Sequence, residues 1–263
     1  MRSRDPGRRD FPWWLVVVGL TLAWLFWQVS TREVYASVLS TLSRGIGITV
    51  LVTVVAFLGA ALLGMLLALG QLSRFRVLRQ LCRLYVEVMR GIPILVLLLY
   101  VTFVLAPAMV AGWNALPEAL SLPDWRTRDF PLLWRAVLAL CLAYASFLAE
   151  VFRAGLLSVE EGQVEAAEAL GLSPSQRFRL IVLPQAMRVI LPPMGNDFVA
   201  MVKDSSLVSV LGVTDITQLG KVTAAGNFRY FETYNVVALI YLTMTLGLSL
   251  ALRGVERRLR AGR

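Results

Sequence analysis

Two pairs of opposite charges lie within apolar segments of this chain, where ionic chemistry is unusual. Glu87 and Arg90 are three residues apart, as are Glu150 and Arg153, so each pair could meet on one face of a helix. Charges in apolar segments are costly, and they usually face a protein interior or a partner. Two hypotheses stay open for these pairs: structural ion pairing, and a role as a gate or a brace.

A second polar group lies near residue 200, between two apolar stretches. Its members are Asn196, Asp197, Lys203, Asp204, Ser205 and Ser206. Pro192 and Pro193 come just before it and predict a broken helix, whose free backbone groups could bind a polar solute. These side chains could pair with the positive and negative groups of such a solute. Alternatively, Lys203 and Asp204 pair with each other and anchor the helix at the membrane edge.

Several kinds of chemistry are excluded by the residue types. The chain has no histidine, which removes His-dependent catalysis and most transition-metal sites. Its two cysteines, Cys82 and Cys141, form neither a disulfide framework nor a metal motif. There is no G-x-x-x-x-G-K-[ST] phosphate-binding loop. We therefore expect no enzymatic activity, no metal and no cofactor bound by this chain.

The composition is that of an all-α integral membrane protein. Hydrophobic residues make up 57% of the 263 residues, and the mean hydropathy is +0.68. The net charge is +9, but the basic residues cluster beside apolar segments. That pattern indicates membrane topology and contact with lipid, and we expect no nucleic-acid partner.

Apolar segments predict about six membrane-spanning helices. We place them at 12–29, 45–72, 84–106, 132–157, 185–202 and 233–252. The first could instead be a signal peptide cleaved after Ala36, but its length and its tryptophans favour a retained helix. The stretch after the fifth, "SSLVSVLGV", is short and is expected to be partly inserted or interfacial.

The distribution of Lys and Arg predicts the orientation. Sixteen lie in the N-terminus, loop 73–83, loop 158–188 and the tail from Arg253, against eight on the opposite side. This bias places both termini and loop 158–188 in the cytoplasm.

The stretch "EAAEALGLSPSQRFRLIVLP", residues 165–184, predicts two helices joined by an elbow. Residues 164–170 are good helix formers, and Gly171 then suits a positive φ. Ser173 is expected to cap a second helix that starts at Pro174 and runs to Val182. The elbow could be a connector on the membrane surface, or a docking element for a soluble partner.

This stretch resembles the EAA signature of ABC importer permeases. The matching residues are Glu165, Ala166, Ala167, Gly171, Ile181, Leu183 and Pro184. "RLYVEVMRGIPILVLL", "FLAEVFRAGLLSVEEGQ" and "LPQAMRVILPPMGNDFVAMVKDSSLVSVLGV" resemble further parts of permeases for polar amino acids. Ile92, where many members have Thr, and the long loop 107–131 depart from the pattern.

The resemblance implies a division of the chain and a mode of action. Residues 1–44 would add a basic N-terminus, a first helix and a connecting loop to a five-helix permease domain, 45–253, with an EAA loop at 158–184 and a basic tail at 254–263. Leu170 and Leu172 would join the signature residues in a coupling helix that docks on an ATP-binding subunit.

The implied function is that of a permease subunit in the bacterial inner membrane. The implied partners are two ATP-binding subunits that hold ATP and Mg²⁺, a second permease in a homodimer or heterodimer, a periplasmic or extracellular solute-binding protein, and an amino acid. The alternative is a secondary transporter or channel, for which inverted repeats are expected, and we see none.

Overall fold

The computed structural model describes residues 13–115 and 124–261, and all regular secondary structure in these ranges is helical. The expected all-α membrane architecture is confirmed. The α-helices are α1 (Trp13–Thr31), α2 (Glu33–Ser43), α3 (Ile46–Gln71), α4 (Arg76–Gly91), α5 (Ile94–Tyr100), α6 (Ala106–Asn114), α7 (Leu132–Leu157), α8 (Glu161–Ala169), α9 (Pro174–Arg177), α10 (Leu183–Asp204), α11 (Ile216–Asn227) and α12 (Tyr230–Ala261). Two π-helical turns, η1 (Val101–Leu105) and η4 (Phe178–Val182), and two 3₁₀ helices, η3 (Thr127–Asp129) and η5 (Ser205–Leu211), connect them.

Within the described residues, four helical stretches are long and apolar enough to cross a membrane. They are Glu33–Gln71, Ile94–Asn114, Leu132–Leu157 and Tyr230–Gly254, and Val16–Thr31 is apolar but shorter. The segment expected to connect the first two spans is therefore largely helical, because α2 leads almost directly into α3. Helix α10 corresponds to the expected fifth span but is not among these four stretches.

The expected third span, 84–106, is not one helix. Helix α4 ends at Gly91, Ile92 is extended with φ −96° and ψ 129°, and α5 begins after Pro93. The physical reason is that a residue before proline is pushed out of the helical region by the proline ring. The spanning segment consequently starts ten residues later than the prediction and continues to Asn114.

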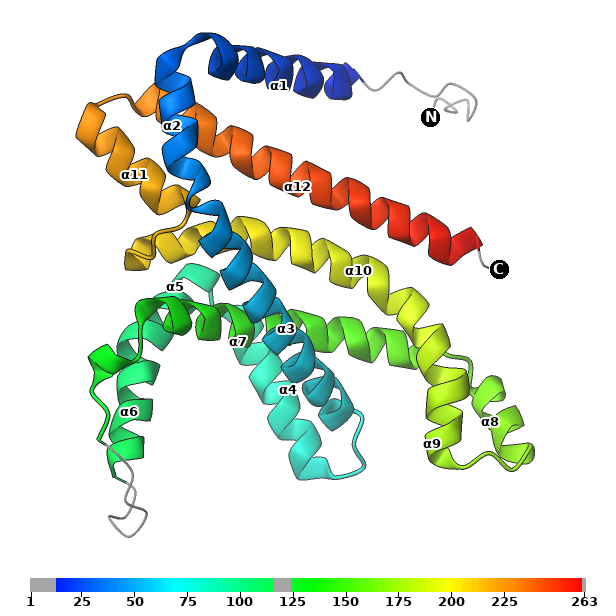
Figure 1. Cartoon of the computed structure of the whole chain (residues 1–263). Helices are drawn as coiled ribbons and strands as arrows, with labels where there is room; N and C mark the ends of the chain where they lie inside the picture. The colour runs from blue at the N-terminus through cyan, green and yellow to red at the C-terminus, as the bar shows by residue number, and fades with distance from the viewer. Residues whose placement is uncertain (1–12, 116–123, 262–263) are drawn as a thin grey trace, which may run out of the picture.

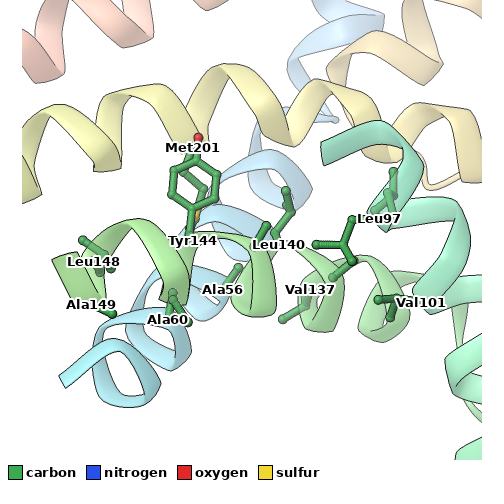
Figure 2. Close-up of a cluster of buried hydrophobic side chains, with 14 of the residues drawn as sticks. Ala56, Ala60, Leu97, Val101, Val137, Leu140, Tyr144, Leu148, Ala149 and Met201 are labelled. Carbon is green, nitrogen blue, oxygen red and sulfur yellow. The ribbon is translucent and has the colours of Figure 1, made fainter. Parts of the chain in front are cut away.

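Small residues allow the helices of the core to approach one another closely. Ala56, Ala60 and Gly64 on α3 face α7, and a Cβ on Gly64 would lie 3.0 Å from the carbonyl oxygen of Ala145. Figure 2 shows buried side chains of this core, which come from α3, α5, η1, α7 and α10. Close packing of small residues is the usual basis of helix association in membranes.

The elbow lies at one end of the bundle. Figure 1 shows α8 and α9 toward the same side as the start of α1 and the end of α12, whereas α11 lies at the opposite side. The elbow is therefore well separated from the α10–α11 connection, and α10 links the two.

Candidate functional site

The first half of the elbow ends in a Schellman motif. The N–H of Leu172 donates to the carbonyl of Ala167 at 3.1 Å, and the N–H of Gly171 donates to that of Glu168 at 2.9 Å. Gly171 has φ +77°, a conformation that glycine adopts without a steric penalty. The structure thus ends α8 at the residue that the sequence indicated.

The second half begins with a capping box. The hydroxyl of Ser173 accepts a bond from the N–H of Gln176, and the amide oxygen of Gln176 accepts one from the N–H of Ser173 at 2.9 Å. Pro174 occupies the first turn, where its missing N–H costs nothing. Both sides of the elbow are therefore held by local hydrogen bonds.

The tip of the elbow presents apolar surface to solvent. Leu170 is 82% exposed, and Glu165 and Ala166 are also exposed. Ala167 is buried, and Leu172 is half-buried. A Cβ on Gly171 would meet no atom within 4 Å, so its backbone conformation, and not crowding inside the chain, explains the glycine. An exposed leucine on a fixed turn is suited to insertion into a partner's groove.

The second helix of the elbow, expected to run from Pro174 to Val182, does not stop at Val182. It continues through η4 into α10, so the chain is helical without interruption from Pro174 to Asp204. The wider π turn, Phe178–Val182, ends two residues before Pro184, which has no N–H for the regular helical bond. Ile181 and Leu183 lie within this continuous helix. The elbow is therefore continuous with α10.

Helix α10 also passes through Pro192 and Pro193 without breaking, contrary to the predicted broken helix. Proline removes a backbone donor but does not end a helix whose surroundings hold it in place. Those surroundings include Gly155 of α7, where an added Cβ would lie 2.3 Å from Cγ1 of Ile190. The stretch that follows, expected to be partly inserted or interfacial, is η5, in which Ser205, Val208, Ser209 and Leu211 are buried in the protein.

Of the two charged pairs singled out in the sequence, both within the described residues, Glu150–Arg153 forms an ion pair and Glu87–Arg90 does not. Nη2 of Arg153 lies 2.7 Å from Oε2 of Glu150, forming an ion pair on α7. In the described ranges Glu87 and Arg90 form no such pair, because the guanidinium of Arg90 lies over the ring of Phe147, 5.9 Å from its centre. Arg90 thus connects α4 to α7 instead of neutralising its neighbour.

The polar group near residue 200 divides between two faces of α10. Residues seven apart share a face, which places Asp197 with Asp204 and Asn196 with Lys203. Asp204 accepts a hydrogen bond of 2.7 Å from the hydroxyl of Tyr144 on α7, and it does not pair with Lys203. Asn196 is exposed, and Asp197 is half-buried.

Lys203 lines a cavity of about 310 Å³ at the end of α10. The other lining residues are Ser206, Thr217, Val237 and Tyr241, which come from η5, α11 and α12. Ser205 is buried and donates to the carbonyl of Val202, so its hydroxyl proton is used within the chain. The cavity brings together one ammonium and three hydroxyl groups, a set that can bind a carboxylate.

Asp215 was not among the site residues predicted from the sequence. It supports the wall of this cavity through a hydrogen bond to Tyr241. Its fully buried carboxylate accepts a bond of 2.7 Å from the N–H of Gln218, which caps α11, and one of 3.1 Å from the hydroxyl of Tyr241. Tyr241 lies 3.1 Å from the hydroxyl of Thr217. The pattern Asp215-x-x-Gln218 after Gly212 is a helix-start signal that could have identified the cap, but not the bond to Tyr241.

Within residues 13–115 and 124–261, no cluster of three or more His, Cys, Asp or Glu side chains is arranged to hold a metal ion.

The sequence of this chain matches a known protein family. Residues 60–261 match the family model described as "binding-protein-dependent transport system inner membrane component". The chain is 36% identical over 214 residues to the probable amino-acid permease protein YxeN of Bacillus subtilis, covering 81% of this chain and 89% of that protein. It is 34% identical over 219 residues to the glutamine transport system permease protein GlnP of Escherichia coli, covering 83% and 93%.

A solved structure is similar as well. A chain in the crystal structure of an amino acid ABC transporter with histidines superimposes with a TM-score of 0.68 at 32% identity, covering 83% of this chain and 94% of that one.

Proposed function

This chain belongs to the family of binding-protein-dependent transport system inner membrane components, and from that premise we propose how it works within an importer. It is the membrane-spanning permease subunit of an ATP-driven importer of polar amino acids. Members of this family work with an ATP-binding subunit and a substrate-binding protein.

We propose that the elbow is the docking site of the ATP-binding subunit. Leu170 would enter a groove on that subunit, flanked by Leu172 and by the exposed Glu165 and Ala166. Two ATP-binding subunits would serve two permeases, either two copies of this chain or this chain and a related one. ATP and Mg²⁺ would be held by the ATP-binding subunits, and this chain would carry out no bond chemistry.

The helix from Pro174 to Asp204 would act as a lever. Closure of the ATP-binding subunits would pull on Leu170, and the capped elbow would pass the displacement to α10. Ile190 rests on Gly155, so α7 would serve as the fulcrum against which α10 moves. The Glu150–Arg153 pair lies on the same end of α7 and would brace this fulcrum.

The far end of the lever would lie beside the substrate route. Asn196, Asp197, Lys203 and Ser206 offer an amide, a carboxylate, an ammonium and a hydroxyl. These groups complement the ammonium and the carboxylate of an amino acid. Asp204 and Ser205 would instead fix the end of α10, through Tyr144 and the carbonyl of Val202.

The protein is a multi-pass inner-membrane subunit. Both termini and the elbow would lie in the cytoplasm. This orientation agrees with the twofold excess of Lys and Arg on that side and with the common placement of α8, the start of α1 and the end of α12.

The exposure of Leu170 on a fixed turn is the observation that carries this proposal. The test is to purify tagged wild type and the Leu170→Asp variant in mild detergent and to measure the ATP-binding subunit that co-purifies. We expect the variant to lose most of it. Phe228→Asp is the matched control, because Phe228 is also 82% exposed, lies on the opposite side of the bundle and has φ +56°, which Asp tolerates.

Equal co-purification with wild type and Leu170→Asp would refute docking through Leu170. If no ATP-binding subunit accompanies the wild type, and uptake follows an ion gradient, the secondary-transporter alternative would replace the ABC mechanism.

A further inference from the structure

Helix α4 lies before the third span and is not needed to cross the membrane. Ile94–Asn114 alone has 21 residues, which at 1.5 Å per residue covers about 30 Å, the thickness of the hydrocarbon core. The extended residue Ile92 and Pro93 separate α4 from that span. A helix with such a break at its end can lie along the membrane surface.

One face of α4 is anchored to the protein. Cys82 and Val86 are buried, and the sulfur of Cys82 lies so close to Gly70 of α3 that a Cβ there would be 2.3 Å away. The hydroxyl of Tyr85 donates a bond of 2.9 Å to the carbonyl of Leu142 on α7. These contacts fix the rotation of α4 about its own axis.

A second face is apolar and has no partner in the described structure. Val77, Leu81, Leu84 and Val88 are spaced by four, three and four residues, so they form one stripe along three turns. Their exposed fractions are 73%, 58%, 60% and 45%. A stripe of this length is more than the scattered apolar exposure of an ordinary surface.

A third face carries a row of arginines. Arg76, Arg79, Arg83 and Arg90 fall within an arc of about 60°, turned roughly 140° from the apolar stripe. None of the four forms an ion pair in the described residues, and Glu87 is the only acidic residue between Arg74 and Arg90. A row of cations nearly opposite an apolar stripe is the arrangement of a helix that lies in an anionic membrane surface.

We propose that α4 is an interfacial helix that binds the headgroups of anionic phospholipids. The apolar stripe would enter the acyl region, and the arginine row would bind phosphate groups. Charge argues against a second copy of this chain as the occupant. Two such stripes packed against each other would bring two arginine rows together without matching acids. The proposal rests on the membrane assignment but not on docking of the ATP-binding subunit.

The test measures lipid bound to the full chain. The chain is purified in detergent containing equal amounts of phosphatidylglycerol and phosphatidylcholine, and the retained lipids are quantified by mass spectrometry. We expect wild type to retain phosphatidylglycerol in excess and Arg76→Gln/Arg79→Gln/Arg83→Gln to lose the preference. Three basic groups near an anionic surface together change affinity by roughly a hundredfold. Arg76→Lys/Arg79→Lys/Arg83→Lys should keep the preference, because the charge is retained.

The matched control is Arg32→Gln/Arg128→Gln/Arg229→Gln, which removes three exposed arginines outside α4 and should leave the preference unchanged. Equal loss in both triple variants, or no loss in either, overturns the proposal. So does a Leu81→Cys variant that cross-links to a permease or an ATP-binding subunit, since the stripe would then be a protein interface. If the Arg76→Gln/Arg79→Gln/Arg83→Gln variant does not fold, the lipids retained by wild type are measured at increasing salt concentration. A preference for phosphatidylglycerol that does not weaken as salt is added contradicts phosphate binding.

Discussion

Nη1 of Arg177 lies 2.5 Å from Oε2 of Glu168, so an ion pair joins the end of α8 to α9 across the elbow. The Glu168 side chain is 67% exposed, and an exposed pair contributes at most about 1 kcal/mol. The backbone caps at Gly171 and Ser173 therefore contribute more to the shape of the elbow than this ion pair does.

Substitution of Gly171 should uncouple transport through this chain from ATP hydrolysis by the ATP-binding subunit. Any residue with a Cβ at φ +77° is strained, by about 1–2 kcal/mol for most side chains. We expect Gly171→Trp to abolish ATP-dependent uptake into membrane vesicles while the amount of inserted protein stays the same. Gly171→Asn should retain most uptake, because Asn adopts this conformation more readily.

Glu168→Gln is the control for that series, since it removes only the exposed ion pair. Uptake should stay within about twofold of wild type. Normal uptake by Gly171→Trp would show that the conformation of the elbow is not required for coupling.

Gly155→Ala should destabilise the contact between α7 and α10. The added methyl group would lie 2.3 Å from Cγ1 of Ile190, and overpacking of this kind costs about 1–3 kcal/mol. The measurement is the midpoint of thermal unfolding of the purified chain. Gly162→Ala on α8 has no neighbour within 4 Å and should not lower the midpoint.

A double variant makes this prediction specific to Ile190. Gly155→Ala/Ile190→Ala should be less destabilised than the sum of the two single variants, because the shortened side chain leaves room for the methyl group. Additive effects would mean that the two residues do not compete for the same space.

Asp215→Ala should lower the unfolding midpoint more than Asp215→Asn. Alanine removes the cap of α11 and leaves the Tyr241 hydroxyl without its acceptor, at a combined cost of about 2 kcal/mol or more. Asparagine keeps one acceptor oxygen and can donate to Tyr241. Equal midpoints for wild type and Asp215→Ala would remove Asp215 from the organisation of the cavity wall.

Cysteine labelling from one side of the membrane should distinguish the two ends of the bundle. In a background with Cys82→Ala and Cys141→Ala, and in cells without the ATP-binding subunit so that Leu170 is not covered, an impermeant maleimide should label Phe228→Cys on intact cells and Leu170→Cys only in inside-out vesicles. Both positions are 82% exposed, so accessibility within the protein does not bias the comparison. The reverse pattern would invert the proposed orientation.

Local features were predictable because the interactions that create them join residues close in sequence. The cap at Ser173 needs only Gln176, and the end of α8 needs only Gly171 and the turn before it. The apolar spans follow from composition over about 20 residues. The missed break at Ile92 was local as well, since Pro93 disfavours a helical residue before it, and the apolar residues on both sides concealed this signal.

The sequence by itself determined the membrane architecture, the elbow and the family signature, since each is encoded in one short stretch. Only the tertiary structure decided that α10 stays helical through Pro192 and Pro193, because neighbouring helices support it there. The same holds for the bond from Tyr144 to Asp204, 60 residues apart, and the bond from Tyr241 to Asp215, 26 residues apart. Which polar groups meet across such distances depends on how the helices pack, and no local pattern records it.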